Sequence, residues 1–391
     1  MAPGDSRSGA DFALAGLRVA LVGPTPPPHG GMANQTRLLG RLLEMEGAHV
    51  ERIATNPPFR PAWIANARGL RALARLLPYI TRLWGVAGRS DVIHVMASSG
   101  WSWHLYAAPV VWMAAARGTP VVVNYRGGGA RSFFDREFWA VGPTLRRAGA
   151  IAVPSAFLER IFQERGIKAW IVPNMIDRAL FRPAAPAPPG GPPAAKEGGG
   201  PELVVARNLE TIYDVGTALR ALKQVRVRVP GAHLSVAGSG PERSRLEALA
   251  MELGLQGAVT FTGQLENADM VALYQRADVA INPSRVDNMP ISILEALACG
   301  VPVVSTNVGG IPDLVAHDRT ALLVPPQDPE AMASAVVSIL VQPARAEALR
   351  QAGLSHVAGY SWPHVRGRWL EVYRHAAAAA GASDRPRTPA S

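Results

Sequence analysis

The sequence predicts an α/β protein with two doubly wound domains, each built on a parallel sheet. Short runs rich in valine and isoleucine alternate with segments of helical periodicity, which is the pattern of βαβ units. The length of 391 residues exceeds what one compact core usually holds. A stretch of proline, alanine and glycine at 183–200 interrupts the alternation and cannot build a core, so it predicts a linker between two domains.

The expected strands fall on both sides of this linker. In the first domain, residues 1–182, they are 17–23, 49–55, 92–97, 120–126, 150–155 and 170–174. In the second domain, residues 201–359, they are 202–207, 233–238, 258–263, 279–284, 302–307 and 321–326. Helical periodicity fills the intervals, for example at 241–254 and 269–277. The composition of 381–391 predicts a disordered tail.

Composition and charge limit the classes of partner. A hydrophobic share of 48% with 18% charged residues is typical of a folded chain. The net charge of +10 favours an anionic partner. No zinc-ligand spacing, aromatic RNA-binding string or basic helix-turn-helix pattern supports nucleic acid, so a phosphorylated ligand or an anionic membrane surface fits better. Cys299 has no disulfide partner and the first residues lack a signal-peptide pattern, so we expect a cytoplasmic location.

Two segments bear on membrane contact. No apolar run reaches the roughly 20 residues that span a bilayer. The nearest, 101–116, contains His104 and Pro109 and predicts a buried helix. The segment 66–89 is basic and apolar, and Pro78 interrupts its period. It fits an amphipathic helix on an anionic membrane surface or an ordinary helix packed on the sheet, and the sequence leaves both open.

Ligands of open parallel sheets bind at the carboxyl ends of the strands, so the loops there are candidate sites. After the first strand, Gly30 and Gly31 precede a helix whose N-terminus favours an anion. Their spacing is not GxGxxG and no acidic residue follows at the dinucleotide distance, so a nicotinamide cofactor is not expected. In 236–249, Gly238 and Gly240 form a second glycine-rich turn. Each pair fits a structural turn or a ligand contact.

The segment 282–315 carries the most specific pattern. A polar loop with Asp287 runs into a helix whose early face carries Glu295, and a buried strand then leads to a further pair, Gly309 and Gly310. Acidic side chains and closely approaching backbone therefore converge on one edge of the second sheet. This run closely resembles the retaining GT-B glycosyltransferases often called family 4, which transfer sugars from nucleotide-sugars.

The resemblance implies roles for the two acidic residues. The family has two glutamates separated by seven residues; here Glu295 holds the second position and Asp287, one methylene shorter, holds the first. By this resemblance the fold is GT-B, with the donor held in a cleft between the two domains. Glu295 then accepts hydrogen bonds from the ribose hydroxyls, and Asp287 reaches hydroxyls of the transferred sugar.

The resemblance covers nearly the whole chain and extends the implied donor site. Arg207 stands where the family arginine binds the donor diphosphate, a role suited to a guanidinium, but Ile212 stands where a lysine usually follows. Pro290 replaces a glycine and offers no N–H. The other implied donor contacts are Asn208, Asn288 and the backbone around Met289, Ile291 and Ser292. The segment 360–380 resembles the closing helix that returns to the first domain.

The catalytic groups are less well defined. The family's histidine near the reacting centre is missing, because the strand at 120–126 supplies Asn124, Tyr125 and Arg126 instead. The candidates are Asp287, Arg207 and His29, and no general base is assigned; His94 on an alternating strand favours a core residue. Retaining transfer of this kind depends more on stabilising the leaving phosphates than on a strong base. The sequence contains no D-x-D pair, so neither a metal nor another cofactor is expected.

Three functions remain open from the sequence. The leading one is a retaining glycosyltransferase that moves a sugar from a nucleotide-sugar, most commonly a uridine diphosphate sugar in this family, to a glycan or lipid-linked saccharide. The missing lysine and histidine motivate a noncatalytic GT-B protein that binds a nucleotide-sugar or a partner glycosyltransferase. A nucleotide-sugar epimerase or a phosphorylase is the third, although none of the lysines Lys168, Lys196 and Lys223 lies in a pyridoxal-binding motif.

Overall fold

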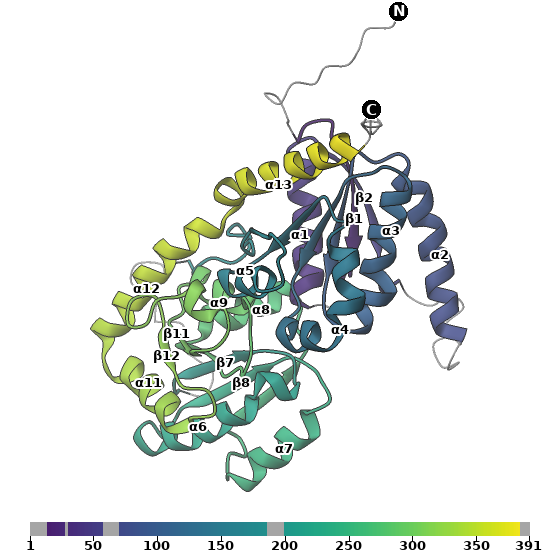
Figure 1. The fold of residues 1–391 in the computed structure, drawn as a ribbon. Helices are drawn as coiled ribbons and strands as arrows, with labels where there is room; N and C mark the ends of the chain where they lie inside the picture. Colours follow the sequence, from purple (N-terminus) through teal and green to yellow (C-terminus); the bar gives the residue numbers. More distant parts are fainter. Residues whose placement is uncertain (1–13, 28–29, 58–69, 186–198, 384–391) are drawn as a thin grey trace, which may run out of the picture. The chain divides into compact units, whose positions relative to one another are not determined.

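The computed structural model of the chain describes residues 14–27, 30–57, 70–185 and 199–383 (Figure 1). Contacts between residues divide the chain into two compact units. Unit 1 comprises Met1–Val172 and Val365–Ser391, and unit 2 comprises Pro173–His364. Most of the predicted linker at 183–200 and of the predicted tail at 381–391 lies outside the described residues.

Unit 1 contains a parallel sheet in the strand order β2-β1-β3-β4-β5-β6. The strands are β1 Arg18–Gly23, β2 His49–Ala54, β3 Val92–Ala97, β4 Val121–Tyr125, β5 Ala150–Val153 and β6 Trp170–Ile171. The last strand is shorter than the expected 170–174, because Pro173 has no N–H to continue the ladder.

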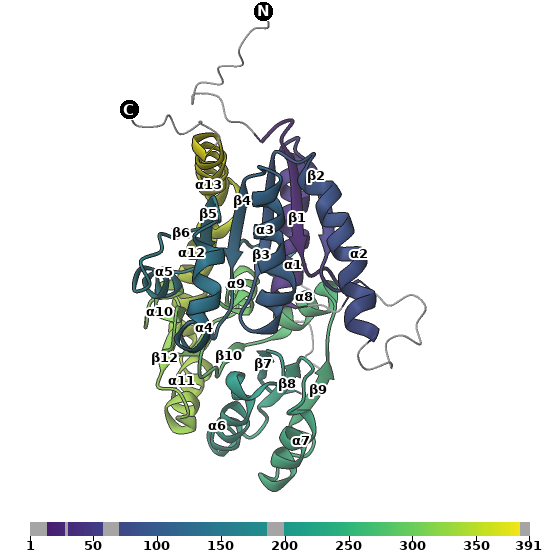
Figure 2. The same ribbon diagram turned by 45° about the vertical axis from the view of Figure 1, so that its right-hand side comes forward.

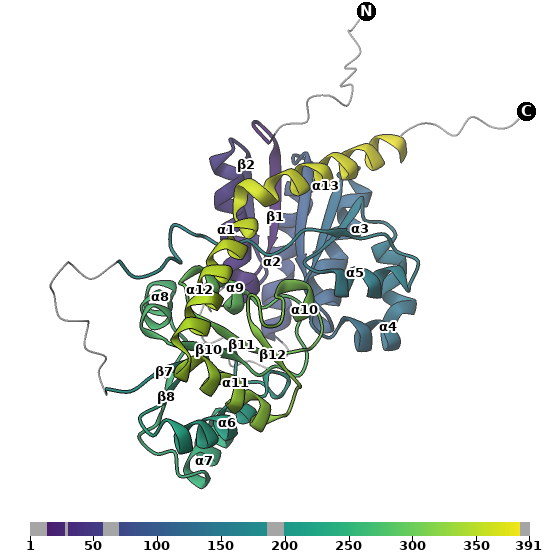
Figure 3. The ribbon, with the colours of Figure 1, turned by 90° about the vertical axis from the view of Figure 1, so that its left-hand side faces the viewer.

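Helices cover both faces of this sheet. They are α1 Gly31–Met45, α2 Leu70–Ala87, the π-helical turn η2 Trp103–Ala107, α3 Ala108–Ala116, α4 Ala130–Leu145, α5 Ala156–Gln163 and α13 Trp362–Ser383. Helices α2 to α5 pack on one face (Figure 2), and α1 and the part of α13 in unit 1 lie on the other (Figure 3). The connection from β1 to β2 moves toward one edge of the sheet, whereas the later connections all move toward the other edge. Because each crossover is right-handed, α1 must lie on the face opposite to α2 to α5.

The side chains of β3 and β4 alternate between the two faces. Val95 and Val123 face the apolar core under α2 to α5. His94 is fully buried on the other face, where its Nδ1 lies 2.9 Å from the Tyr373 hydroxyl and its Nε2 lies 3.0 Å from the Asn124 amide. Burial lowers the pKa of His94 to about 3, so its imidazole is neutral. His94 is therefore a hydrogen-bonded core residue that joins the sheet to α13, as its alternating position predicts.

Unit 2 repeats the architecture with the strand order β12-β11-β10-β7-β8-β9, again parallel. The strands are β7 Glu202–Ala206, β8 His233–Ala237, β9 Val259–Gly263, β10 Val279–Asn282, β11 Val303–Thr306 and β12 Leu322–Val324. The helices are α6 Val215–Arg228, α7 Arg243–Glu252, α8 Asn267–Arg276, α9 Ile291–Ala298, α10 Ile311–Leu314, α11 Pro329–Val341 and α12 Pro343–Val357. Two apolar clusters fill the two faces, one under α6, α7 and α11 and one under α8 and α9.

Two sequence expectations for helices need correction. Helix α2 continues through Pro78, which removes one backbone hydrogen bond without ending the helix, because the next turn buries Tyr79 and Leu83 against the sheet. The segment 101–116 is helical but buried on one side only, since Trp112 is 45% exposed. No helix in the described part of the chain is both long and apolar enough to cross a bilayer.

Candidate active site

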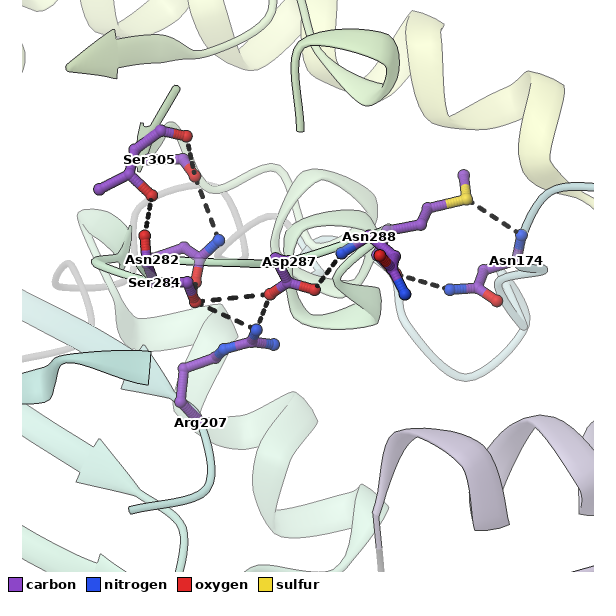
Figure 4. Close-up of polar contacts among 9 residues, drawn as sticks. Asn174, Arg207, Asn282, Ser284, Asp287, Asn288 and Ser305 are labelled. Carbon is purple, nitrogen blue, oxygen red and sulfur yellow. Dashed lines mark hydrogen bonds and ion pairs between the residues drawn. The ribbon is translucent and has the colours of Figure 1, made fainter. Parts of the chain in front are cut away.

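The candidate site lies at the carboxyl ends of two neighbouring strands of unit 2, β7 and β10. Arg207 is the first residue after β7, and Ser284 and Asp287 follow β10. Because β7 and β10 pair in parallel, their ends meet at one edge of the sheet, and the three side chains converge there (Figure 4). The sequence-predicted residues Arg207 and Asp287 are therefore brought into direct contact.

Arg207 is almost enclosed by this cluster. Its Nη2 donates to the Ser284 hydroxyl at 3.1 Å and forms an ion pair with the Asp287 carboxylate, and the side chains of Arg207 and Asp287 are only 11% and 13% exposed. The guanidinium carbon lies 4.2 Å from the centre of the Tyr213 ring. Burial lowers the pKa of Arg207, because removal from water disfavours the charged form. Its Nε is buried and has no hydrogen-bond partner among the described residues.

The loop that carries Asp287 is fixed by its own backbone. The Asn288 N–H donates to Asp287 Oδ1 at 2.9 Å, and the Gly310 N–H donates to the Asp287 carbonyl at 2.9 Å. Gly309 adopts a φ of 57°, and a β-carbon there would overlap the Asp287 carbonyl. Glycine is therefore required at 309, both for its left-handed conformation and for the close approach of the two loops.

A buried network beneath this loop ties it to the sheet. Ser284 donates to Asn282 Oδ1 at 2.8 Å, and the Asn282 amide donates to the Ser305 hydroxyl at 3.1 Å (Figure 4). Thr306 on β11 donates to the Ser284 carbonyl at 2.6 Å. The hydroxyl that accepts from Arg207 is thus held by residues of two adjacent strands, so its position is determined by the sheet itself.

Glu295 lies on α9, one turn from the N-terminus of that helix, and is 9% exposed. The Tyr274 hydroxyl on α8 donates to Glu295 Oε2 at 3.3 Å. Burial raises the pKa of Glu295 to about 7, and the Tyr274 hydrogen bond and the charge of Arg207 oppose this rise. A carboxyl group that titrates near neutrality beside a desolvated arginine is typical of a binding or catalytic site.

The remaining residues of the loop are anchored from within unit 2. The Asn174 amide donates to the Met289 carbonyl at 2.6 Å, and the Asn174 N–H lies 3.2 Å from the Met289 sulfur. Pro290 caps α9, so Ile291 and Ser292 occupy the first turn of the helix. The contact of Asn174 with Met289 joins positions 115 residues apart, and no local sequence pattern signals it.

The glycines and Asn208 have other immediate partners. A β-carbon at Gly238 would overlap the Arg207 carbonyl, and one at Gly240 would overlap the Leu209 carbonyl, so both glycines let the loop after β8 pack against the loop that carries Arg207. Asn208 is exposed, and its amide lies 3.4 Å from Glu210. Gly238 and Gly240 thus approach the Arg207 loop through their backbone, and the Asn208 side chain points to Glu210 rather than to Asp287.

The candidates in unit 1 occupy a separate part of the chain. Gly30 precedes α1 in an extended conformation, and its carbonyl accepts from the Asn34 N–H at 2.9 Å. Gly31 is the first residue of α1. His29 lies outside the described residues. Sequence reasoning missed Tyr213 and Tyr274, which pack on Arg207 and Glu295, because tyrosines on separate helical turns carry no motif.

The fold and the family matches together define a class of protein. Two Rossmann-like parallel-sheet units are the architecture of the GT-B fold. Residues 193–356 match the model of the family "Glycosyl transferases group 1", and residues 3–174 match that of "Glycosyl transferase 4-like domain". The chain belongs to the group 1 glycosyltransferases, as the sequence pattern predicts.

Individual relatives include several sugar transferases. Glycogen synthase of Mycobacterium tuberculosis is 29% identical over 298 residues, which cover 73% of this chain and 69% of the relative. A GDP-mannose-dependent phosphatidylinositol monomannoside mannosyltransferase of the same species is 33% identical over 51% of this chain and 52% of its own length.

Solved structures share the fold at low sequence identity. Sucrose-phosphate synthase of Thermosynechococcus elongatus superimposes with a TM-score of 0.72 at 21% identity, over 93% of this chain and all of its own. Anabaena HepE in complex with UDP and glucose gives 0.70 at 16% identity, over 91% of this chain and 98% of its own.

Proposed function

We propose that this glycosyltransferase is a retaining enzyme that takes a sugar from a nucleoside diphosphate donor bound at Arg207, Asp287 and Glu295. The observation that carries the proposal is the state of Arg207: a desolvated cation with a buried Nε that has no acceptor among the described residues. An unsatisfied buried donor costs about 1–3 kcal/mol. A donor phosphate that accepts from this guanidinium would remove that cost once donor binding opens the buried Nε to it.

The three residues would act at different parts of the donor. Arg207 would neutralise the diphosphate as it leaves, which is the main electrostatic demand of the transfer. The Glu295 carboxylate would accept hydrogen bonds from the ribose hydroxyls. Asp287 would accept from hydroxyls of the transferred sugar, and its contact with Arg207 would orient it toward the bond that breaks. The acceptor hydroxyl would then attack the anomeric carbon on the face that the diphosphate leaves, and its proton would pass to the departing diphosphate.

We further propose a uridine diphosphate sugar as donor and a reaction without a metal. UDP is the nucleotide in the HepE structures, while the mannosyltransferase relative is named for GDP-mannose, so both nucleotides belong in the assay. Among the described residues, no group of three His, Cys, Asp or Glu side chains is placed to hold a metal ion. Transfer rates are therefore expected to stay unchanged in excess EDTA.

The acceptor, in this proposal, is a glycan or a lipid-linked saccharide at the cytoplasmic face of a membrane. Support comes from α2, which corresponds to most of the segment 66–89 and contains arginines but no acidic residue. Leu77 and Trp84 on this helix are 61% and 47% exposed. A helix of this kind suits a membrane surface better than bulk water.

Binding and turnover together test the function. UDP, GDP and ADP are titrated into the protein by calorimetry, and a panel of nucleotide-sugars is assayed for released nucleotide. Arg207→Gln is expected to weaken nucleotide binding by about 10- to 100-fold, because it removes a charge-assisted contact. Arg243→Gln, which alters an exposed arginine of unit 2 paired with Glu247, is the matched control and should bind like wild type.

Each result has a distinct meaning. Binding that depends on Arg207 with no transfer or hydrolysis from any donor would support the noncatalytic alternative. If no nucleotide binds, or if Arg207→Gln binds as well as Arg243→Gln, the donor site is not where we place it.

A further inference from the structure

Three tryptophans on consecutive helices of unit 1 are exposed to solvent. Trp84 on α2, Trp112 on α3 and Trp139 on α4 are 47%, 45% and 82% exposed. These helices pack side by side on the same face of the sheet (Figure 2). In contrast, the sequence of unit 2 contains a single tryptophan, Trp362. Exposed indole rings therefore occur mainly in unit 1, on these three helices and at Trp101, which precedes η2 and is 77% exposed.

Two of these rings carry an arginine from a neighbouring segment. The guanidinium of Arg117, just after α3, lies 5.1 Å from the centre of the Trp84 ring. A β-carbon at Gly88 would overlap this guanidinium, so glycine one turn beyond Trp84 makes room for it. Arg147, just after α4, lies 4.2 Å from the centre of the Trp112 ring. Both stacks hold a cation and an apolar ring together at the surface.

We call Trp84, Trp112, Trp139, Arg117 and Arg147 the tryptophan–arginine face. The acidic residues near it are few and paired. Residues 52–134 include ten arginines and one acidic residue, Asp91, which is paired with Arg18 at 2.6 Å. On α4, Asp135 pairs with Arg165 and Glu137 pairs with His104. Helices α2 and α3 contain no acidic residue. The face therefore combines exposed aromatic rings with an excess of positive charge.

The arginines beside the exposed rings are not the arginines of α2. Arg75 donates to the Pro57 carbonyl at 3.3 Å, and Arg82 donates to the Arg52 carbonyl at 3.1 Å and lies 3.7 Å from Glu51. These two arginines are thus engaged within unit 1. Arg117 and Arg147, which come from outside 66–89, supply the charge next to the exposed rings instead.

We propose that the tryptophan–arginine face binds the surface of an anionic lipid bilayer. Indole rings favour the boundary between headgroups and acyl chains, and arginines beside them are attracted to acidic headgroups. The positive charge of the face favours an anionic bilayer over a neutral one, because the stacked arginines add binding energy only at an anionic surface. The proposal names the contact surface across three helices, and because it concerns binding alone it stands or falls independently of sugar transfer.

Vesicle binding by the full chain tests the proposal. Wild-type protein is incubated with vesicles of phosphatidylcholine alone or with vesicles that also contain phosphatidylglycerol, and the bound fraction is measured by co-sedimentation. The double variant Arg117→Gln/Arg147→Gln is compared with Arg228→Gln/Arg319→Gln, a matched pair on exposed positions of unit 2. Each basic residue near an anionic surface contributes about fivefold, so the first pair should lose about 25-fold and the control should lose nothing.

A second variant keeps the test informative if the arginine pair affects folding. Trp139 is the most exposed of the three rings, so Trp139→Ala should leave the unfolding temperature unchanged. It should still lower the binding to anionic vesicles several-fold and reduce the quenching of protein fluorescence by brominated lipids. Equal binding to neutral and anionic vesicles, or equal loss in both arginine pairs, would overturn the proposal. So would binding to heparin without binding to vesicles, because the face would then serve a soluble polyanion.

Discussion

The raised pKa of Glu295 makes donor binding dependent on pH near neutrality. Burial raises this pKa to about 7. If ribose hydroxyls donate to the carboxylate, the bound donor favours the ionised form and lowers the pKa toward its ordinary value of about 4.3. Donor binding at pH 7 must then release close to half a proton, since about half of the free protein carries the proton at Glu295 and the complex does not.

The expected change in affinity follows from the same values. Protonation competes with the donor below pH 7, so the dissociation constant should fall about tenfold as the pH rises from 6 to 8. Calorimetry in buffers of different ionisation enthalpy measures the released proton directly. The nucleotide's own phosphate also titrates in this range, and Glu295→Gln provides the correction because it keeps the shape of the side chain and cannot ionise.

The comparison of wild type with Glu295→Gln tests whether donor binding is coupled to the ionisation of Glu295. Wild type should show a buffer-dependent binding enthalpy and a steeper pH dependence than the variant. Identical proton release from the two proteins would refute the argument, because the ionisation of Glu295 would then be uncoupled from the ligand.

Two further predictions concern the framework of the protein. Gly309→Ala should lower the free energy of unfolding by about 1–3 kcal/mol in a denaturant titration, and should weaken nucleotide binding, because a β-carbon there overlaps the Asp287 carbonyl at a φ of 57°; unchanged binding would show that the Asp287 loop is dispensable. Tyr373→Phe should cost about 1–3 kcal/mol by leaving the buried His94 Nδ1 without its partner, with little change in nucleotide affinity. A large loss of affinity in that variant would mean that His94 also serves the donor site.

Local sequence patterns were sufficient for the framework of each sheet. The strands from β1 to β5 and from β7 to β12 lie within the expected ranges. Inner strands such as β4 and β10 are largely apolar because both their faces are covered, whereas the edge strands β2 and β9 are partly exposed and mix polar with apolar residues. The loops that carry Arg207 and Asp287 were also predictable, since Arg207 ends one expected strand and Asp287 follows another. The family pattern added Glu295, whose spacing from Asp287 is visible in the chain itself.

The sequence alone therefore determined the α/β class, the identity of Arg207, Asp287 and Glu295 as candidate site residues, and the excess of positive charge. Tertiary structure decided how those residues are used: Arg207 is paired with Asp287, Glu295 is enclosed beside Tyr274, and the Asp287 loop is held by Asn174. It also showed that Arg117 and Arg147, rather than the arginines of α2, lie beside the rings of the tryptophan–arginine face. The physical reason is that strand formation depends on neighbours along the chain, whereas burial, pKa and pairing depend on residues that only folding brings together.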